Sequence, residues 1–203
     1  MSTDQINNKK DEIVIKEEIN MSMKRNKKTD IIKECQSLEQ ELSKYKLWGN
    51  LIPKGSFYAN LRKVLTKNQW DSLRNFVYEK DSYRCFICGI SGITLEAHEH
   101  WKYDYKNSIQ KLHNVNALCR LCHLNNHLGL AAILAREGKL DQRKLAEHWC
   151  KINQKEITSF RQYQKKVKRL WELRNKFEWK IVDKNNKDIF KDLNYNELIE
   201  SLK

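Results

Sequence analysis

The stretch that decides the fold lies between residues 84 and 127, and it reads RCFICG at 84–89, LEAHEHW at 95–101 and HNVNALCRLCHLNNH at 113–127. Two C-x-x-C pairs frame it with thirty residues between them: Cys85, Cys88, Cys119 and Cys122. A C-x-x-C turn directs two thiolates at one tetrahedral ion, and two such turns complete the four-sulfur shell that Zn²⁺ prefers at structural sites. The spacing therefore predicts a structural zinc site and not a disulfide or redox pair.

Histidines in the same stretch predict a second metal position. If the chain becomes helical after the second C-x-x-C, His123 and His127 lie one turn apart on one face, where two imidazoles can bind one ion. His98, from an extended segment, would supply the third ligand. Taken singly, each histidine could also be an ordinary surface or core residue. A three-histidine site accepts Zn²⁺, Ni²⁺, Mn²⁺ or Mg²⁺.

The order C-x-x-C, then LE-x-H, then Asn114 five residues before Cys119 in the string LCRLCH resembles the HNH endonucleases in their zinc-bound, treble-clef form. The resemblance covers about residues 80–130. It implies a ββα-metal unit, in which a hairpin and a helix hold one divalent ion against the scissile phosphate. By position, Asn114 would brace the metal loop, and the ligands of that ion would be His98, His123 and His127.

The general-base position departs from the family pattern. The residue after the first ligand is usually a histidine, and here it is Glu99, with His100 one place further on. In a regular strand, alternation puts His98 and His100 on one face and Glu99 on the other. Three alternatives stay open: the strand ends near His98 and Glu99 turns in, His100 acts as the base, or the site binds without cutting.

Charge and composition point to a polyanionic partner. The chain has 203 residues, a formal charge of +13 and a pI of about 9.4, which favours nucleic acid first and an anionic membrane second. Its apolar runs are too short to span a bilayer, and MSTDQINNKK lacks a signal peptide's apolar region. We therefore expect a cytoplasmic protein that does not enter membranes. Cys35 and Cys150 are then expected to be ordinary buried thiols.

The expected architecture is α+β and mostly helical, with the zinc-bound centre flanked by N- and C-terminal helices. Residues 1–50 are expected to form a polar tail and a charged amphipathic helix, 51–150 the HNH-like zinc domain, and 151–203 a basic helical extension. The first helix is predicted to begin at Thr29-Asp30 and to carry one apolar stripe. That stripe could pack on the core, or it could bind a protein partner or a second copy of the chain.

Several further elements are predicted from local patterns. A capping box at Thr66 and Gln69 begins a helix, and the alternating aromatic residues at 101–105 are expected in the core. After His127 the helix is expected to continue. A long helix is predicted over about 157–176, and its cations could face solvent or contact a nucleic-acid backbone. The candidates for that contact are Arg161, Lys165, Lys168 and Arg169.

These observations together predict a metal-dependent HNH-type endonuclease that hydrolyses phosphodiester bonds in DNA, with structural Zn²⁺ and a second divalent metal. The alternative is a catalytically inactive, zinc-stabilised nucleic-acid-binding or interaction module derived from the same fold. A third possibility is a toxin or defence component whose nuclease acts only with a partner protein. The base position separates the first two, because a phosphodiesterase needs a general base and a binding module does not.

Overall fold

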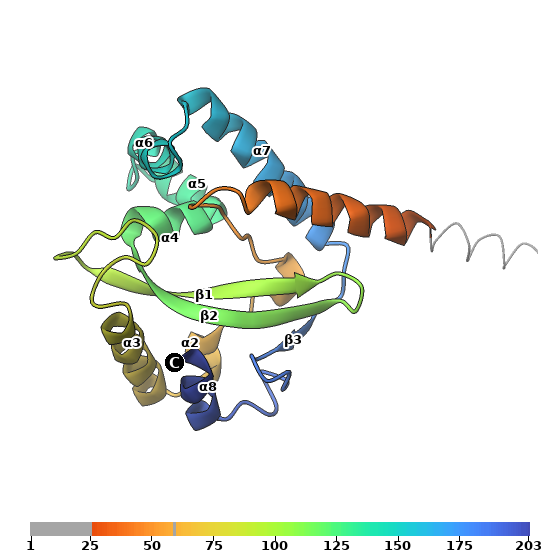
Figure 1. Cartoon of the computed structure of the whole chain (residues 1–203), viewed down its shortest axis with the longest axis vertical. Coiled ribbons are helices and arrows are strands. Elements are labelled where there is room, and N and C mark those ends of the chain that lie inside the picture. Colours follow the sequence, from red (N-terminus) through yellow and green to blue (C-terminus); the bar gives the residue numbers. More distant parts are fainter. Residues whose placement is uncertain (1–25, 59) are drawn as a thin grey trace, which may run out of the picture.

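A long β-hairpin crosses the middle of the molecule (Figure 1). Its strands are β1 (Leu95–Asp104) and β2 (Ile109–Cys119), and β3 (Lys180–Val182) pairs in parallel with the start of β2, giving the order β1-β2-β3. The computed structural model describes residues 26–58 and 60–203. Most of the predicted polar tail lies outside this described part. The expected α+β class is confirmed.

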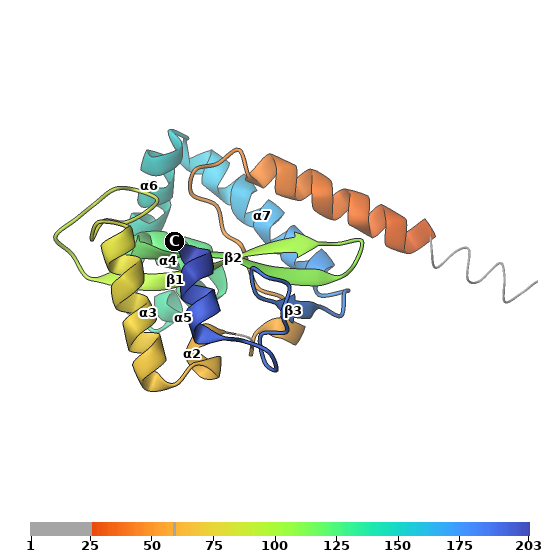
Figure 2. The same ribbon diagram turned by 60° about the horizontal axis from the view of Figure 1, so that its bottom comes forward.

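Helices cover both faces of the hairpin (Figures 1 and 2). Over one face lie the helix of residues 26–42 and four later helices: α4 (Arg120–Asn126), α5 (Leu128–Arg136), α6 (Gln142–Asn153) and α7 (Ile157–Arg174). Beneath the other face lie α2 (Leu61–Val64), α3 (Lys67–Lys80) and α8 (Tyr195–Leu202). A short 3-10 turn, η1 (Lys54–Ser56), precedes α2. Both faces of the hairpin are therefore covered by helices.

The register of the hairpin decides which side chains share a face. His98 pairs with Asn116, Glu99 with Val115 and His100 with Asn114, and the register then shifts between His100 and Trp101. Residues directly opposite each other in an antiparallel pair project to the same side. β1 continues as a strand to Asp104, so it does not end near His98 as one of the alternatives required.

The aromatic residues of the hairpin belong to the core, as predicted: Trp101, Tyr103 and Tyr105 are all buried. The rings of Tyr103 and Tyr105 lie near the fully buried guanidinium of Arg174, whose carbon is 3.7 Å from the centre of the Tyr103 ring and 6.0 Å from that of Tyr105. Arg174 also donates to the Tyr105 hydroxyl at 3.0 Å and to Glu39 at 3.2 Å. These contacts offset the cost of burying the cation and connect α7, the hairpin and the first helix.

The first helix packs on this chain's own core. Cys35 and Leu42 are fully buried, and Arg169 of α7 donates to both carboxylate oxygens of Glu34, at 2.7 and 2.9 Å. Its apolar stripe is therefore covered without a second copy of the chain. The predicted start is wrong, because residues 26–30 are already helical and Thr29 lies within the helix. A side-chain cap at Thr29 would need an extended backbone, which the helix there excludes.

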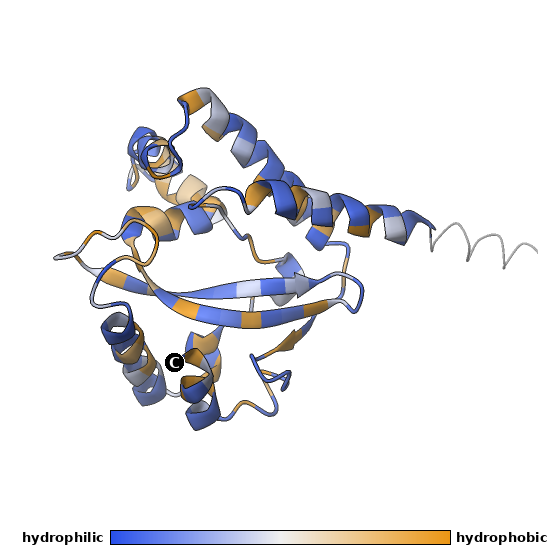
Figure 3. Cartoon of the chain, in the orientation of Figure 1, coloured by the Kyte–Doolittle hydropathy of each residue, from blue (hydrophilic) through white to orange (hydrophobic). Residues whose placement is uncertain are grey.

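Two later helices begin at side-chain caps. Thr66 and Gln69 form the predicted capping box of α3, and Asp141 caps α6 by accepting from the backbone N–H of Arg143. The expectation of one helix running through His127 is wrong: α4 ends at Asn126, and α5 begins at Leu128 after a break with φ −115° and ψ 57°. Figure 3 shows that α5 is mostly apolar while α7 is mostly hydrophilic. Within the described residues, every helix is too short or too polar to cross a bilayer.

Candidate metal centres

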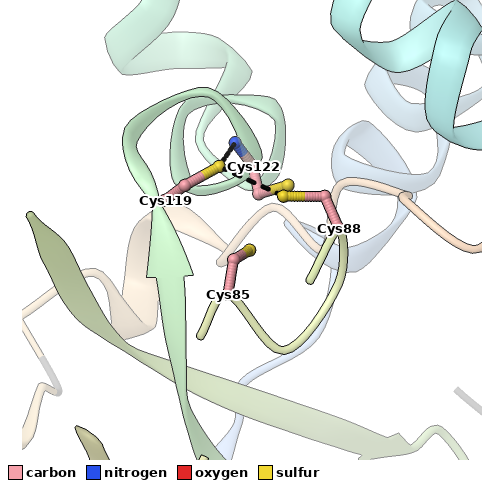
Figure 4. A group of neighbouring side chains, drawn as sticks. All are labelled: Cys85, Cys88, Cys119 and Cys122. Carbon is pink, nitrogen blue, oxygen red and sulfur yellow. Dashed lines mark hydrogen bonds between the residues drawn. The ribbon is translucent and has the colours of Figure 1, made fainter. Parts of the chain in front are cut away.

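Four cysteine sulfurs converge at one end of the hairpin (Figure 4). Cys85 and Cys88 lie in the loop after α3, Cys119 ends β2, and Cys122 lies in the first turn of α4. All four sulfurs lie within 4.8 Å of one another, and those of Cys88 and Cys119 are 3.7 Å apart. Two sulfurs on a tetrahedral ion with bonds of about 2.3 Å are separated by about 3.8 Å. The cluster can therefore hold a metal ion such as Zn²⁺.

Backbone contacts hold the first cysteine pair against β2. The N–H of Phe86 donates to the carbonyl of Ala117 at 2.8 Å, and the Asp81 carboxylate accepts from the N–H of Ala117 at 2.7 Å. The turn closes through the N–H of Gly89, which donates to Cys85 at 2.8 Å; Gly89 has a φ of +77°, a conformation that glycine adopts without strain. These hydrogen bonds fix the loop of the first cysteine pair against β2.

The cysteines differ in their affinity for protons. Hydrogen bonds from the Cys119 and Cys122 thiols lower the pKa of Cys85, whereas hydrogen bonds with the Cys119 and Cys85 sulfurs, together with burial, raise the pKa of Cys122. Four thiolates this close repel one another strongly, and a divalent cation removes that repulsion. Metal binding at this cluster should therefore release protons.

Three imidazoles meet where α4 crosses β1. Nε2 of His127 lies 3.1 Å from Nδ1 of His98, and the centre of the His123 ring lies 5.3 Å from that of His98 and 4.5 Å from that of His127. One ligand atom from each ring lies within 4.8 Å of the others. His98 comes from the strand, His123 from α4 and His127 from the break after α4. The predicted triad is assembled, and it can hold a metal ion.

The triad is built to be neutral. Burial, together with the neighbouring imidazoles of His127 and His123, lowers the pKa of His98 well below its ordinary value, and its side chain is 8% exposed. Burial lowers the pKa of both His123 and His127 to about 4. Neutral imidazoles keep a lone pair for a metal ion. Nδ1 of His123 lies 3.0 Å from a carboxylate oxygen of Glu96, which can orient the ring.

Glu99 faces away from the triad. Its carboxylate accepts from the backbone N–H of Leu61 at 2.6 Å, at the start of α2 on the opposite side of the hairpin from α4. Burial raises the pKa of the Glu99 carboxyl to about 7. Its partner and its direction both indicate that it holds α2 to the hairpin.

His100 projects from the same face of β1 as His98, and burial lowers its pKa to about 4. Asn114 lies directly opposite His100 on β2. The side-chain oxygen of Asn114 accepts from the backbone N–H of Val115 at 2.9 Å and from Lys80 at 3.1 Å. These hydrogen bonds connect β2 to the end of α3, whereas the family resemblance placed the Asn114 contact in a metal loop.

Two polar residues near the centres carry no motif in the sequence. Asn116 is 7% exposed and lies opposite His98, and its side-chain nitrogen has no hydrogen-bond partner among the described residues. His148 of α6 places Nε2 3.1 Å from the sulfur of Cys122. Strand alternation would have placed Asn116 near the triad once the register was known, but no local pattern connects His148 to a cysteine 26 residues earlier.

The four cations proposed for nucleic-acid contact are exposed on α7: Arg161, Lys165, Lys168 and Arg169. Arg169 is paired with Glu34, and Lys168 lies 3.8 Å from Glu172. Arg161 and Lys165 form no ion pair within the described part of the chain. The acidic residues of the first helix therefore reduce the positive charge of this surface, and Arg161 and Lys165 retain theirs.

Comparisons with known proteins add no identification. No protein-family model, curated protein or solved structure matches the chain. What the fold and the two centres define is a class of site: a four-cysteine cluster beside a three-histidine cluster, joined by one hairpin and one short helix.

Proposed function

We propose that the chain is a metal-dependent endonuclease of the HNH type that hydrolyses phosphodiester bonds in DNA. The observation that carries the proposal is the convergence of His98, His123 and His127. His98 comes from the first strand of the hairpin, and the other two come from α4 and its end, directly after the second strand. The hairpin and α4 correspond to the ββα-metal unit of the resemblance. The four cysteines would then hold the zinc of a treble-clef centre.

The buried triad supports a catalytic metal over a purely structural one. The four cysteines can already hold a structural metal ion. Burying a second cluster of neutral imidazoles has a desolvation cost, and a bound cation would offset that cost. A divalent ion in this site would stabilise the charge that develops on the phosphate and on the leaving 3′ oxygen. Three protein ligands leave positions open for substrate.

We assign the general base to His100. It shares the face of β1 that carries His98, and its imidazole is neutral at pH 7, so that it can accept a proton from the attacking water. Glu99 occupies the family's usual base position, but its carboxylate is bound to the start of α2. The base has thus moved one residue along the strand and onto the metal face.

One observation favours the alternative function. With Glu99 turned to α2, the family's base position has a structural use, as expected for a module that kept the fold and lost the chemistry. Such a module would bind DNA through its net charge of +13 without cutting it. The two functions share the zinc site and differ only in cleavage.

The deciding experiment is plasmid cleavage by the purified, zinc-loaded protein with Mg²⁺, Mn²⁺, Ni²⁺ and EDTA in parallel. The proposal predicts nicking or linearisation with at least one ion and none with EDTA. DNA binding without cleavage under any of these conditions would favour the alternative. To identify the base, His100→Ala should lose about 10²-fold or more in cleavage rate, and Glu99→Gln should lose far less.

A further inference from the structure

A histidine outside the metal motifs touches the cysteine cluster. Nε2 of His148 lies 3.1 Å from Sγ of Cys122, although the two residues belong to different helices, α6 and α4. The four cysteines already complete a tetrahedral shell without it. Its position beside one of those sulfurs therefore calls for a role other than that of a fifth ligand.

Packing holds His148 in this position. The next residue, Trp149, is fully buried, with its ring 5.0 Å from Tyr45 and 4.6 Å from Tyr163. One turn earlier, Leu145 is buried in a small cluster with Leu124 of α4. α6 is thus held by Tyr45 and α7 on one side of His148 and by α4 on the other, and this packing places the imidazole against Cys122.

The chemistry of the contact follows from charge. Four thiolates around Zn²⁺ leave the centre with two net negative charges, and an N–H donated to one of those sulfurs stabilises that excess charge. A neutral imidazole has one N–H, and with Nε2 as the donor the other nitrogen is free of the proton. Groups that hydrogen-bond to metal ligands commonly change metal affinity by about 10- to 100-fold.

We infer that His148 belongs to the zinc centre as a positioning residue: it donates an Nε2–H hydrogen bond to the Cys122 thiolate and slows the loss of zinc to chelators and thiol-reactive agents. The same contact connects the metal to α6. Zinc loss should therefore loosen α6 as well as the cysteine loop. This inference does not depend on the nuclease proposal, because it concerns the cysteine cluster alone.

The test is the rate of zinc release from zinc-loaded wild type, His148→Ala and His148→Gln, measured with a chromogenic chelator and a thiol-reactive disulfide. His148→Ala should release zinc about 10-fold faster or more, and His148→Gln, which keeps an N–H donor, should lie between it and wild type. The control is His113→Ala, which removes an exposed histidine of β2. Equal release rates for wild type and both His148 variants would overturn the inference.

The cobalt-substituted protein gives a second readout. Because Cys122 stays a ligand in every variant, the charge-transfer band should keep four-sulfur intensity, and it should shift in position in His148→Ala. A wild-type spectrum with three sulfurs and one nitrogen would instead make His148 a ligand, contradicting the hydrogen-bond role. Amide hydrogen exchange across residues 142–153 should increase on zinc removal in wild type; unchanged exchange there would contradict the connection to α6.

Discussion

Nε2 of His127 lies 3.1 Å from Nδ1 of His98, which joins the end of α4 to the middle of β1. Two nitrogens bound to one tetrahedral ion at about 2.05 Å lie about 3.3 Å apart, so the two rings already have nearly the spacing of co-ligands. The contact also explains the break between α4 and α5. With a backbone φ of −115°, His127 leaves the helix and directs its ring at the strand.

His127→Ala should abolish divalent-metal binding at the histidine cluster and leave the zinc content unchanged, because the cysteines are separate ligands. Metal content of the zinc-loaded protein, followed by Mn²⁺ or Ni²⁺ titration, measures both sites at once. His113→Ala is the matched control, since this residue is exposed on β2. A variant that still binds one equivalent of the second metal at wild-type affinity would show that His127 is not a ligand.

Cys119→Ser should lose most of its bound zinc and a large part of its thermal stability, because metal binding at such sites is coupled to folding. Serine can still accept from the backbone N–H of Cys122, as the Cys119 sulfur does at 3.4 Å, so the cap of α4 is preserved. The measurement is metal analysis with a melting curve, and Cys150→Ser, outside the cluster, is the control. A full zinc equivalent with an unchanged melting temperature would remove Cys119 from the site.

Glu99→Gln should change the pH dependence of stability. The folded-state pKa of Glu99 is about 7 and its ordinary value is 4.5, so the folded chain holds this proton more tightly. Wild-type stability from this group is therefore fully present below pH 4.5 and is lost as the pH rises to about 7. Each pKa unit corresponds to about 1.4 kcal/mol. Because the Glu99 side chain is partly exposed, we expect the wild type to lose roughly 1–2 kcal/mol of unfolding free energy over this pH range, and we expect Glu99→Gln to show no such loss.

Denaturant unfolding of both proteins between pH 5 and pH 8 measures this difference. Glutamine can still accept from the N–H of Leu61, so the contact with α2 is kept. The buried histidines lose stability in the opposite direction, as pH falls, and they contribute equally to both proteins. A constant difference in unfolding free energy across this pH range would contradict the raised pKa.

How much of this site was predictable depends on whether neighbours in space are also neighbours in sequence. The cysteine spacing predicted the four-sulfur cluster, and the helical spacing of His123 and His127 predicted their meeting, because both depend on local geometry. The direction of Glu99 depended on where β1 ends, and that end is set by pairing with β2 down to Ile109. The alternation of side chains along a regular strand therefore gave the correct direction for Glu99. Only the pairing register could show that β1 continues as a strand past this residue.

The contacts that sequence could not reveal are tertiary. His148 reaches Cys122 only because the packing of Leu145 on α4 and of Trp149 on α7 fixes α6 beside the cysteine cluster. Glu34 neutralises Arg169 across 135 residues of sequence, which no local charge count of α7 could anticipate. The covered stripe of the first helix is a similar case, since its partner is the core of the same chain.

The salt dependence of DNA binding should locate the electrostatic contact. Arg161→Gln with Lys165→Gln should reduce the slope of log affinity against log salt by about 1.8 if both side chains contact phosphates of duplex DNA. Arg169→Gln should change the slope less, because that charge is already paired with Glu34. The control with equal charge change is Lys67→Gln with Lys191→Gln, two exposed lysines at other surfaces that form no ion pair within the described residues.

An unchanged slope in the Arg161 and Lys165 variant would place the contact elsewhere. The first place to examine is the cavity of about 510 Å³ between the end of the first helix and the turn from α6 to α7. Lys44, Lys46 and Lys155 line it and form no ion pair within the described residues. Replacing these three with glutamine would then reduce the slope.

The most direct test of the central claim is the cleavage of supercoiled plasmid by zinc-loaded wild type, His98→Ala and the control Cys150→Ser at one fixed concentration of the activating divalent metal. A catalytic centre at the triad predicts that wild type and Cys150→Ser convert the plasmid at similar rates and that His98→Ala, with its zinc still bound, converts none. Cleavage by His98→Ala at the wild-type rate would contradict the claim. So would a wild type that binds the plasmid and never cuts it with any divalent metal.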